Sequence, residues 1–233
     1  MHSTDYCKFL MKAAKETLNE IFSINNECDF EIWPEYLVTV LLGSNMNKYL
    51  KKSLYFEEQV IDLAKFNFRF NLMRDFANRA SLLKLRSSLA KLFSRRNGNV
   101  DIAFYDKGLG GEFLGENSKG SVYSIIEVKK NGNNKKEIDK DIIRLIDFMI
   151  YSLNDESKHL SYASLVFFPD EKDIRDYRSL CNKLLSAHNK KICVKVDDGV
   201  ESFKDAEHED YDGSEARVFI KKIIVITFYK CDV

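Results

Sequence analysis

The sequence predicts a mixed α/β fold, in which a central mixed sheet carries helices on its faces. Segments whose apolar residues recur at the helical period alternate with short runs of strand-like alternation or continuous apolar character. The expected order is helix, three strands, helix and strand, followed by further helical and strand segments, which is typical of this architecture. The chain has 233 residues, 45% of them hydrophobic, and two prolines, so we expect one domain over 1–233.

The first half of the chain is predicted to alternate helices with strands. Apolar residues at helical spacing indicate a helix over 4–22, and Pro34 suits the first turn of a second helix. The next predicted elements are a strand over 54–60, a helix over 72–94 with a basic outer face, and strands over 100–105 and 122–130. We expect the last two strands to form a hairpin with a long glycine-rich loop.

The second half is predicted to form a helix that follows the hairpin, one buried strand and a C-terminal α/β extension over 170–233. Its predicted elements are a helix over 135–153, a strand over 161–168 that ends at Pro169, a helix over 171–187, and strands over 190–196 and 216–229. Nine acidic residues make 197–215 too polar to pack, so we expect a loop there.

Charge is balanced overall but unevenly distributed. Thirty-six basic residues match thirty-six acidic ones, so composition alone gives no case for a nucleic-acid-binding protein. Six basic residues and no acidic one lie between Arg79 and Arg96, however, whereas 197–215 is strongly acidic. The chain is therefore dipolar, and a basic helix is available for contacts with a phosphate backbone.

Cysteine and histidine patterns exclude several classes of site. Five cysteines, an odd number without a C-x-x-C pair, indicate reduced thiols in place of a disulfide framework or a zinc ribbon. H-E-x-x-H and G-x-S-x-G are absent, which leaves zinc hydrolysis and acyl transfer without support. The N-terminus has no signal peptide and no apolar run is long enough to span a membrane, so the expected location is the cytoplasm, without a membrane partner.

Alternation along the predicted hairpin indicates which side chains share a face of the sheet. On the second strand we expect Tyr123, Ile125, Glu127 and Lys129 to point the same way. On the first strand, Asp101 is expected to point away from the apolar residues Val100, Ile102 and Phe104. Pairing of the two strands can then bring Asp101 beside Glu127.

Asp101, Glu127 and Lys129 form a chemically competent set. Two carboxylates that converge from neighbouring strands suit Mg²⁺ or Mn²⁺, and an adjacent lysine can orient water and stabilise charge on phosphate. These are the groups that a metal-dependent phosphodiesterase needs. The alternative is structural, in which Glu127 and Lys129 form an ordinary salt bridge on an exposed sheet face.

The pattern Asn-Val-Asp101-Ile and the later pattern Ile-Ile-Glu127-Val-Lys129, with 25 residues between Asp101 and Glu127, together resemble the PD-(D/E)XK nuclease superfamily. The resemblance covers about 34–169 and implies a restriction-endonuclease-like core, with helical additions, whose Asp and Glu hold the metal while the Lys assists the attacking water. It also implies a metal-binding glutamate in the helix before the first strand. Glu35 is the matching candidate, and Glu58 is a second one.

The resemblance implies a Mg²⁺- or Mn²⁺-dependent nuclease that cleaves DNA in preference to RNA, as an endonuclease, in a bacterial restriction or anti-phage setting. The insert between the first two strands is unusually long for the family, which makes the substrate harder to infer. A homodimer or a protein partner is left open. The alternative function is a non-catalytic nuclease-like scaffold that binds a protein or nucleic acid.

Two basic surfaces are candidates for nucleic-acid contacts. They comprise residues of the basic helix that precedes Asp101 and residues of the helix that follows the motif: Arg86, Lys91, Arg95, Arg96, Lys136 and Lys140. Each surface has a structural alternative, because the first could pack against the acidic loop and the second could be a solvated helix face.

Overall fold

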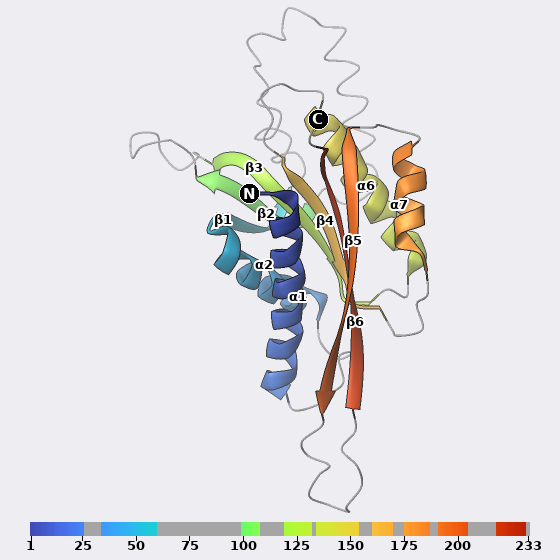
Figure 1. Ribbon diagram of the computed structural model, residues 1–233. Coiled ribbons are helices and arrows are strands. Elements are labelled where there is room, and N and C mark those ends of the chain that lie inside the picture. Colours follow the sequence, from blue (N-terminus) through green and yellow to red (C-terminus); the bar gives the residue numbers. More distant parts are fainter. Residues whose placement is uncertain are drawn as a thin grey trace, which may run out of the picture.

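The computed structural model of the chain contains a six-stranded mixed sheet with helices on both faces (Figure 1). The structure describes residues 1–25, 34–59, 99–107, 119–131, 134–153, 160–169, 175–186, 191–204 and 218–231. Within these ranges the helices are α1 (Ser3–Asn25), α2 (Glu35–Leu50), α6 (Lys135–Leu153) and α7 (Tyr177–Ser186). The strands are β1 (Ser53–Gln59), β2 (Asn99–Lys107), β3 (Lys119–Lys129), β4 (Tyr162–Phe167), β5 (Ile192–Lys204) and β6 (Val218–Lys230). The mixed α/β class predicted from the sequence is confirmed.

The strands are ordered β1-β2-β3-β4-β6-β5 in the sheet. The first three form an antiparallel meander, which includes the predicted β2–β3 hairpin. The helix α6 then carries the chain back so that β4 runs parallel to β3. A parallel pair needs such a crossover, whereas hairpins suffice for antiparallel neighbours. The remaining strands β6 and β5 are antiparallel additions at one edge.

Each face of the sheet buries its own apolar core. The helices α6 and α7 cover one face, where Ile142 and Cys181 pack against Ile226. On the other face, α1 and α2 bring Leu10 and Leu42 against the sheet (Figure 1). Burial on both faces explains why β4 is mostly apolar, since every side chain of β4 is buried, and its one hydroxyl side chain, that of Ser164, shares a hydrogen bond with Thr227.

Most of the expected elements form close to their predicted bounds. The exception among the helices is α7, which begins at Tyr177 and not at residue 171. Asp176 ends the preceding segment, and its Oδ1 accepts a hydrogen bond of 2.9 Å from the backbone N–H of Ser179, as helix-capping residues do. The predicted helix over 72–94 lies outside the described residues.

The prediction of an acidic loop from residue 197 was wrong for its first eight positions. The strand β5 continues to Lys204 and pairs with β6 along its whole length, from Ile192 opposite Lys230 to Lys204 opposite Val218. Along this extended arm α1 supports one side, because Phe22 stacks on Phe203 with ring centroids 3.6 Å apart. Residues 205–217 lie outside the described part of the chain.

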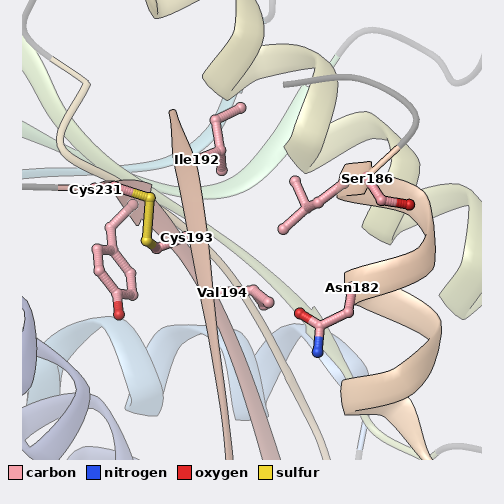
Figure 2. A pocket seen from close by; sticks show the side chains of 8 residues that line it. Asn182, Ser186, Ile192, Cys193, Val194 and Cys231 are labelled. Atoms are coloured by element: carbon pink, nitrogen blue, oxygen red, sulfur yellow. A yellow bond between two sulfur atoms is a disulfide. The ribbon is translucent and has the colours of Figure 1, made fainter. Parts of the chain in front are cut away.

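The prediction that the cysteines are free thiols was wrong for two of the five. Cys193 on β5 and Cys231 after β6 form a disulfide, with Cα atoms 5.2 Å apart, at the rim of a surface pocket that Asn182 and Ser186 also line (Figure 2). The hairpin register brings together two cysteines that lie 38 positions apart in the sequence. The buried Cys181 is free, and its burial raises the pKa of its thiol to about 12.

Reduction of this disulfide is expected to lower the free energy of unfolding by about 2–4 kcal/mol, because the bond restricts the unfolded chain. Urea unfolding with and without a phosphine reductant would measure the loss. The double variant Cys193→Ser/Cys231→Ser is the control, since reductant should leave its midpoint unchanged. Equal midpoints for oxidised and fully reduced wild-type protein would contradict the prediction.

None of the helices in the described ranges is long and apolar enough to cross a membrane.

Candidate functional site

The candidate site forms where β2 and β3 stop pairing. Their ladder ends at Ile102 opposite Ile126. Asp101 is the residue before Ile102 on β2, and its carboxylate lies beside β3. Its Oδ2 accepts a hydrogen bond of 2.7 Å from the backbone N–H of Val128. A side chain therefore takes the place that a carbonyl of β2 would hold in a regular ladder. Asp101 lies against the segment between Glu127 and Lys129.

The backbone of β1 is also irregular at the position that lies opposite Asp101. Glu57, which lies between the β1 residues paired with Val100 and Ile102, has a φ of 51°, a left-handed conformation that is uncommon for residues other than glycine. Val100 packs in the core under α6 and α7, whereas Ile102 and Phe104 pack in the core under α1 and α2. The prediction that these three apolar residues share one face was wrong, because the strand changes face at Asp101.

A similar irregularity alters the faces of β3. The register shifts between Phe104 and Tyr105, and past this point Tyr123 packs on the α1 side, with its ring centroid 5.5 Å from that of Tyr162. Ile125 packs on the opposite side, under α6. The prediction that Tyr123 and Ile125 share a face was therefore wrong.

Lys129 is held between its own strand and α2. Only 8% of the residue is exposed, and its Nζ lies 2.9 Å from Oε1 of Glu35 and donates to the Val128 carbonyl at 3.0 Å. The second oxygen of Glu35 accepts the backbone N–H of Lys130 at 3.2 Å. Of the two glutamates considered from the sequence, Glu35 thus reaches β3, whereas the side chain of Glu58 lies outside the described part.

The position of Glu35 follows from how α2 packs. Pro34 precedes the helix with extended dihedrals, so that Glu35 is the first helical residue. Further along α2, Gly43 passes so close to β1 that a Cβ there would lie 2.5 Å from the Phe56 ring. The absence of a side chain at Gly43 allows α2 to pack this closely on β1, with Glu35 in its first turn.

Glu127 points away from this cluster and into the core under α6. It is fully buried, and one of its carboxylate oxygens accepts a hydrogen bond from the guanidinium of Arg144, which is 2% exposed. Asp141 lies three positions before Arg144 on the same helix and is also buried. Charged groups inside a core must be paired, since an unpaired buried ion is strongly unfavourable.

The spacing of Lys136, Lys140 and Arg144 predicts one basic stripe of α6 that could hold a phosphate backbone. This prediction was wrong for Arg144, because Arg144 is 2% exposed and is paired with Glu127. That pairing was missed from the sequence.

The available signal for the pairing was the position of Arg144 on α6, because Ile142 and Leu145 define the apolar face and Arg144 lies beside them. A charged residue on the buried side of a helix needs a partner in the opposing sheet. Glu127 was the acidic residue on the strand that α6 follows, so the pair could have been proposed from the pattern.

The three carboxylates do not form one set of metal ligands in this arrangement. Carboxylate oxygens are the ligands that Mg²⁺ prefers, so the residue types of Glu35, Asp101 and Glu127 fit that cation. Within the described ranges, however, no group of three or more His, Cys, Asp or Glu side chains could hold a metal ion. Glu127 is instead paired with Arg144 of α6, and Glu35 is paired with Lys129.

Of the residues predicted to contact nucleic acid, two are described. Lys136 and Lys140 are exposed on the first turns of α6, which starts shortly after Lys130 at the candidate site. The other four residues lie outside the described part of the chain: Arg86, Lys91, Arg95 and Arg96.

The pocket beside the disulfide is separate from this cluster. Lys129 pairs with Phe167 at one end of β4, whereas Tyr229, which lines the pocket, pairs with Tyr162 at the other end. The length of β4 therefore separates the candidate site from the pocket.

No family model, no curated protein and no solved structure matches the chain. The fold and the charged cluster at the end of β3 are therefore the basis for assigning a function.

Proposed function

We propose that the protein is a metal-dependent nuclease that hydrolyses phosphodiester bonds, in DNA in preference to RNA, and that 34–169 form a restriction-endonuclease-like core. The observation that carries the proposal is the meeting of Glu35, Asp101 and Lys129 around the backbone of 128–130. These residues come from a helix and two strands that are far apart in the sequence. A structural salt bridge between Glu127 and Lys129 would not require that meeting.

The order of elements supports the same proposal. The helix with Glu35 precedes β1, the aspartate lies on β2, the glutamate and lysine lie on β3, and α6 follows to pack across the sheet. This is the arrangement that the PD-(D/E)XK resemblance implies.

The residues divide the chemistry between them. Asp101 and Glu35, which both contact the backbone of 128–130, would each offer an oxygen to Mg²⁺ or Mn²⁺, whereas Glu127 could do so only away from Arg144. The ion when bound would supply charge stabilisation at the phosphate and a more acidic water.

The ammonium of Lys129 donates hydrogen bonds only, so it can orient a water molecule or stabilise the negative charge on the reacting phosphate. Lys136 and Lys140, which are exposed on the first turns of α6, would contact the phosphate backbone of the substrate.

The test is cleavage of plasmid, linear DNA, single-stranded DNA and RNA with Mg²⁺, Mn²⁺ or EDTA. Metal-dependent cleavage is expected for the wild type and is expected to fall by about 100-fold or more in Asp101→Asn, because a neutral amide is a weak ligand for a hard cation. Asp106→Asn is the matched control, since Asp106 lies on the same strand and pairs with Lys52. Equal loss in both variants, or cleavage that survives Asp101→Asn, would contradict the proposal.

One observation favours a second candidate, a nuclease-like scaffold that binds a partner without catalysis. The Glu127 carboxylate is fully buried and paired with Arg144, which is how a purely structural charge would be placed. A scaffold needs no divalent cation, so absence of cleavage together with absence of any metal effect on the melting temperature would support this alternative.

A further inference from the structure

We propose that β5 is an interface between two copies of this chain. The two β5 strands pair antiparallel about a twofold axis at Val196, so that the two sheets join into one. This interface is separate from the candidate site and does not depend on the proposed function.

The edge strand β5 is long and regular. It has 13 residues and no proline, and among the described strands it pairs with β6 alone (Figure 1). The strand at the other edge, β1, has seven residues and a left-handed conformation at Glu57. Short or distorted edge strands resist pairing with another chain, whereas a long regular edge is a template for it. Of the two edges, β5 is therefore the one suited to strand addition.

The direction of the backbone groups of β5 follows from its ladder with β6. The backbone N–H of Cys231 donates to the carbonyl of Lys191 at 2.9 Å, so the odd-numbered residues of β5 exchange hydrogen bonds with β6. The even-numbered residues then direct their N–H and C=O groups away from the sheet. The guanidinium of Arg178 on α7 donates to the carbonyl of Val196 at 3.1 Å, which agrees with this direction. Because a carbonyl has two lone pairs, that of Val196 can also accept a hydrogen bond from a second strand.

The charges along β5 favour one antiparallel register. Lys191 and Lys195 precede Val196, whereas Asp197 and Glu201 follow it. If Val196 lies opposite Val196 of the second copy, Lys195 of each copy lies opposite Asp197 of the other. In the same register Lys191 lies opposite Glu201, and even-numbered residues face one another as their backbone groups require. The two adjacent registers of this parity place Lys195 against Lys195 or Asp197 against Asp197, and like charges directly opposite are destabilising.

The same register places an exposed valine at a pocket of the second copy. Val200 is 56% exposed, and alternation puts it on the α7 side of the sheet, where Ile192 and Val194 also lie. Val200 of one copy then lies opposite Ile192 of the other, which lines the pocket between β5 and α7 together with Leu185 (Figure 2). Burial of an exposed apolar side chain against apolar residues is favourable. The apolar contact and the charges therefore favour one register independently.

The test is sedimentation equilibrium of the full chain, which measures the Kd of the dimer. The wild type is expected to dimerise, and Lys195→Asp and Asp197→Lys are each expected to raise the Kd by about 10-fold or more, because each places like charges opposite one another. An equimolar mixture of the two variants should restore association, since every opposed pair is then of unlike charge. Both variants lose the 3.0 Å ion pair between Lys195 and Asp197 within one chain, and mixing cannot restore that pair. Lys48→Asp on α2 is the matched control and should keep the wild-type Kd.

Val200→Ser tests the apolar contact separately. It is expected to raise the Kd by about threefold or more, whereas Tyr36→Ser, at a 60% exposed residue of α2, should leave the Kd unchanged. A wild type that stays monomeric up to about 1 mM would overturn the proposal. A dimer whose Kd is unchanged in both charge-reversal variants would overturn it too, because the interface would then lie elsewhere. Failure of the mixture to associate more tightly than either variant alone would have the same meaning.

Discussion

Arg144→Met is expected to lower the free energy of unfolding by about 3–5 kcal/mol in metal-free buffer, the usual loss when a buried ion pair is broken on one side. The reason is that the Glu127 carboxylate stays in the core without the guanidinium that donates to it. Methionine keeps much of the apolar stem of arginine, so the change removes the charge and not the packing. Urea unfolding followed by circular dichroism, with EDTA present, measures the loss.

A double-mutant cycle separates the ion pair from its surroundings. Glu127→Gln/Arg144→Met removes both charges, so it should be more stable than the sum of the two single losses predicts, by about 2 kcal/mol. Lys48→Met is a surface control, because Lys48 and Glu20 form an exposed pair at 3.4 Å whose loss should cost at most about 1 kcal/mol. Additive losses at Glu127 and Arg144 would show that the two residues stabilise the fold independently.

The elements that sequence could predict are those with strong local periodicity. The helix α6 buries Ile138, Ile142 and Leu145 on one face, as the spacing of its apolar residues indicates. The hairpin of β2 and β3 follows from two strand-like runs and a connecting loop. Such features depend on residues close in the chain, so a local pattern is sufficient to predict them.

Features that depend on pairing between distant segments were predicted less well. The acidic composition of 197–204 predicted a loop. Composition does not reveal that β6 pairs with these residues or that α1 packs on them. The disulfide depends on the same hairpin register. Hydrophobic patterning of a strand is weak evidence where tertiary contacts decide the outcome.

In the candidate site, too, the residues were predicted from local pattern, whereas the directions of their side chains were not. Asp101, Glu127 and Lys129 were found from their residue types and spacing, and the structure places Asp101 at the β3 segment that contains the other two. Strict alternation gave the wrong faces, because it assumes a regular strand, whereas β2 changes face at Asp101. Irregular backbone is common at sites that must aim a side chain, so a failure of alternation at Asp101 agrees with a functional role for this position.

Lys129→Met is expected to reduce metal-dependent cleavage by about 100-fold to 10,000-fold, the usual contribution of a group that handles protons or charge in the transition state. Its ammonium lies 2.9 Å from Oε1 of Glu35 and the residue as a whole is 8% exposed, so the charge is preorganised beside a carboxylate that would hold the metal. Such a charge is effective because it needs no reorganisation when negative charge develops on the phosphate. Single-turnover cleavage with saturating Mn²⁺ measures the change.

Calorimetric Mn²⁺ binding distinguishes this catalytic role from a structural one. Lys129→Met removes a donor and no carboxylate ligand, so the Kd for Mn²⁺ should stay within about threefold of the wild type or become tighter, since a repelling charge is lost. Lys140→Met is the control for a lysine that is proposed to contact substrate only, and it should weaken DNA binding in a salt-dependent manner with the single-turnover rate retained. Cleavage by Lys129→Met at the wild-type rate would rule out the assigned role of Lys129, because the metal ligands would then suffice without its ammonium group.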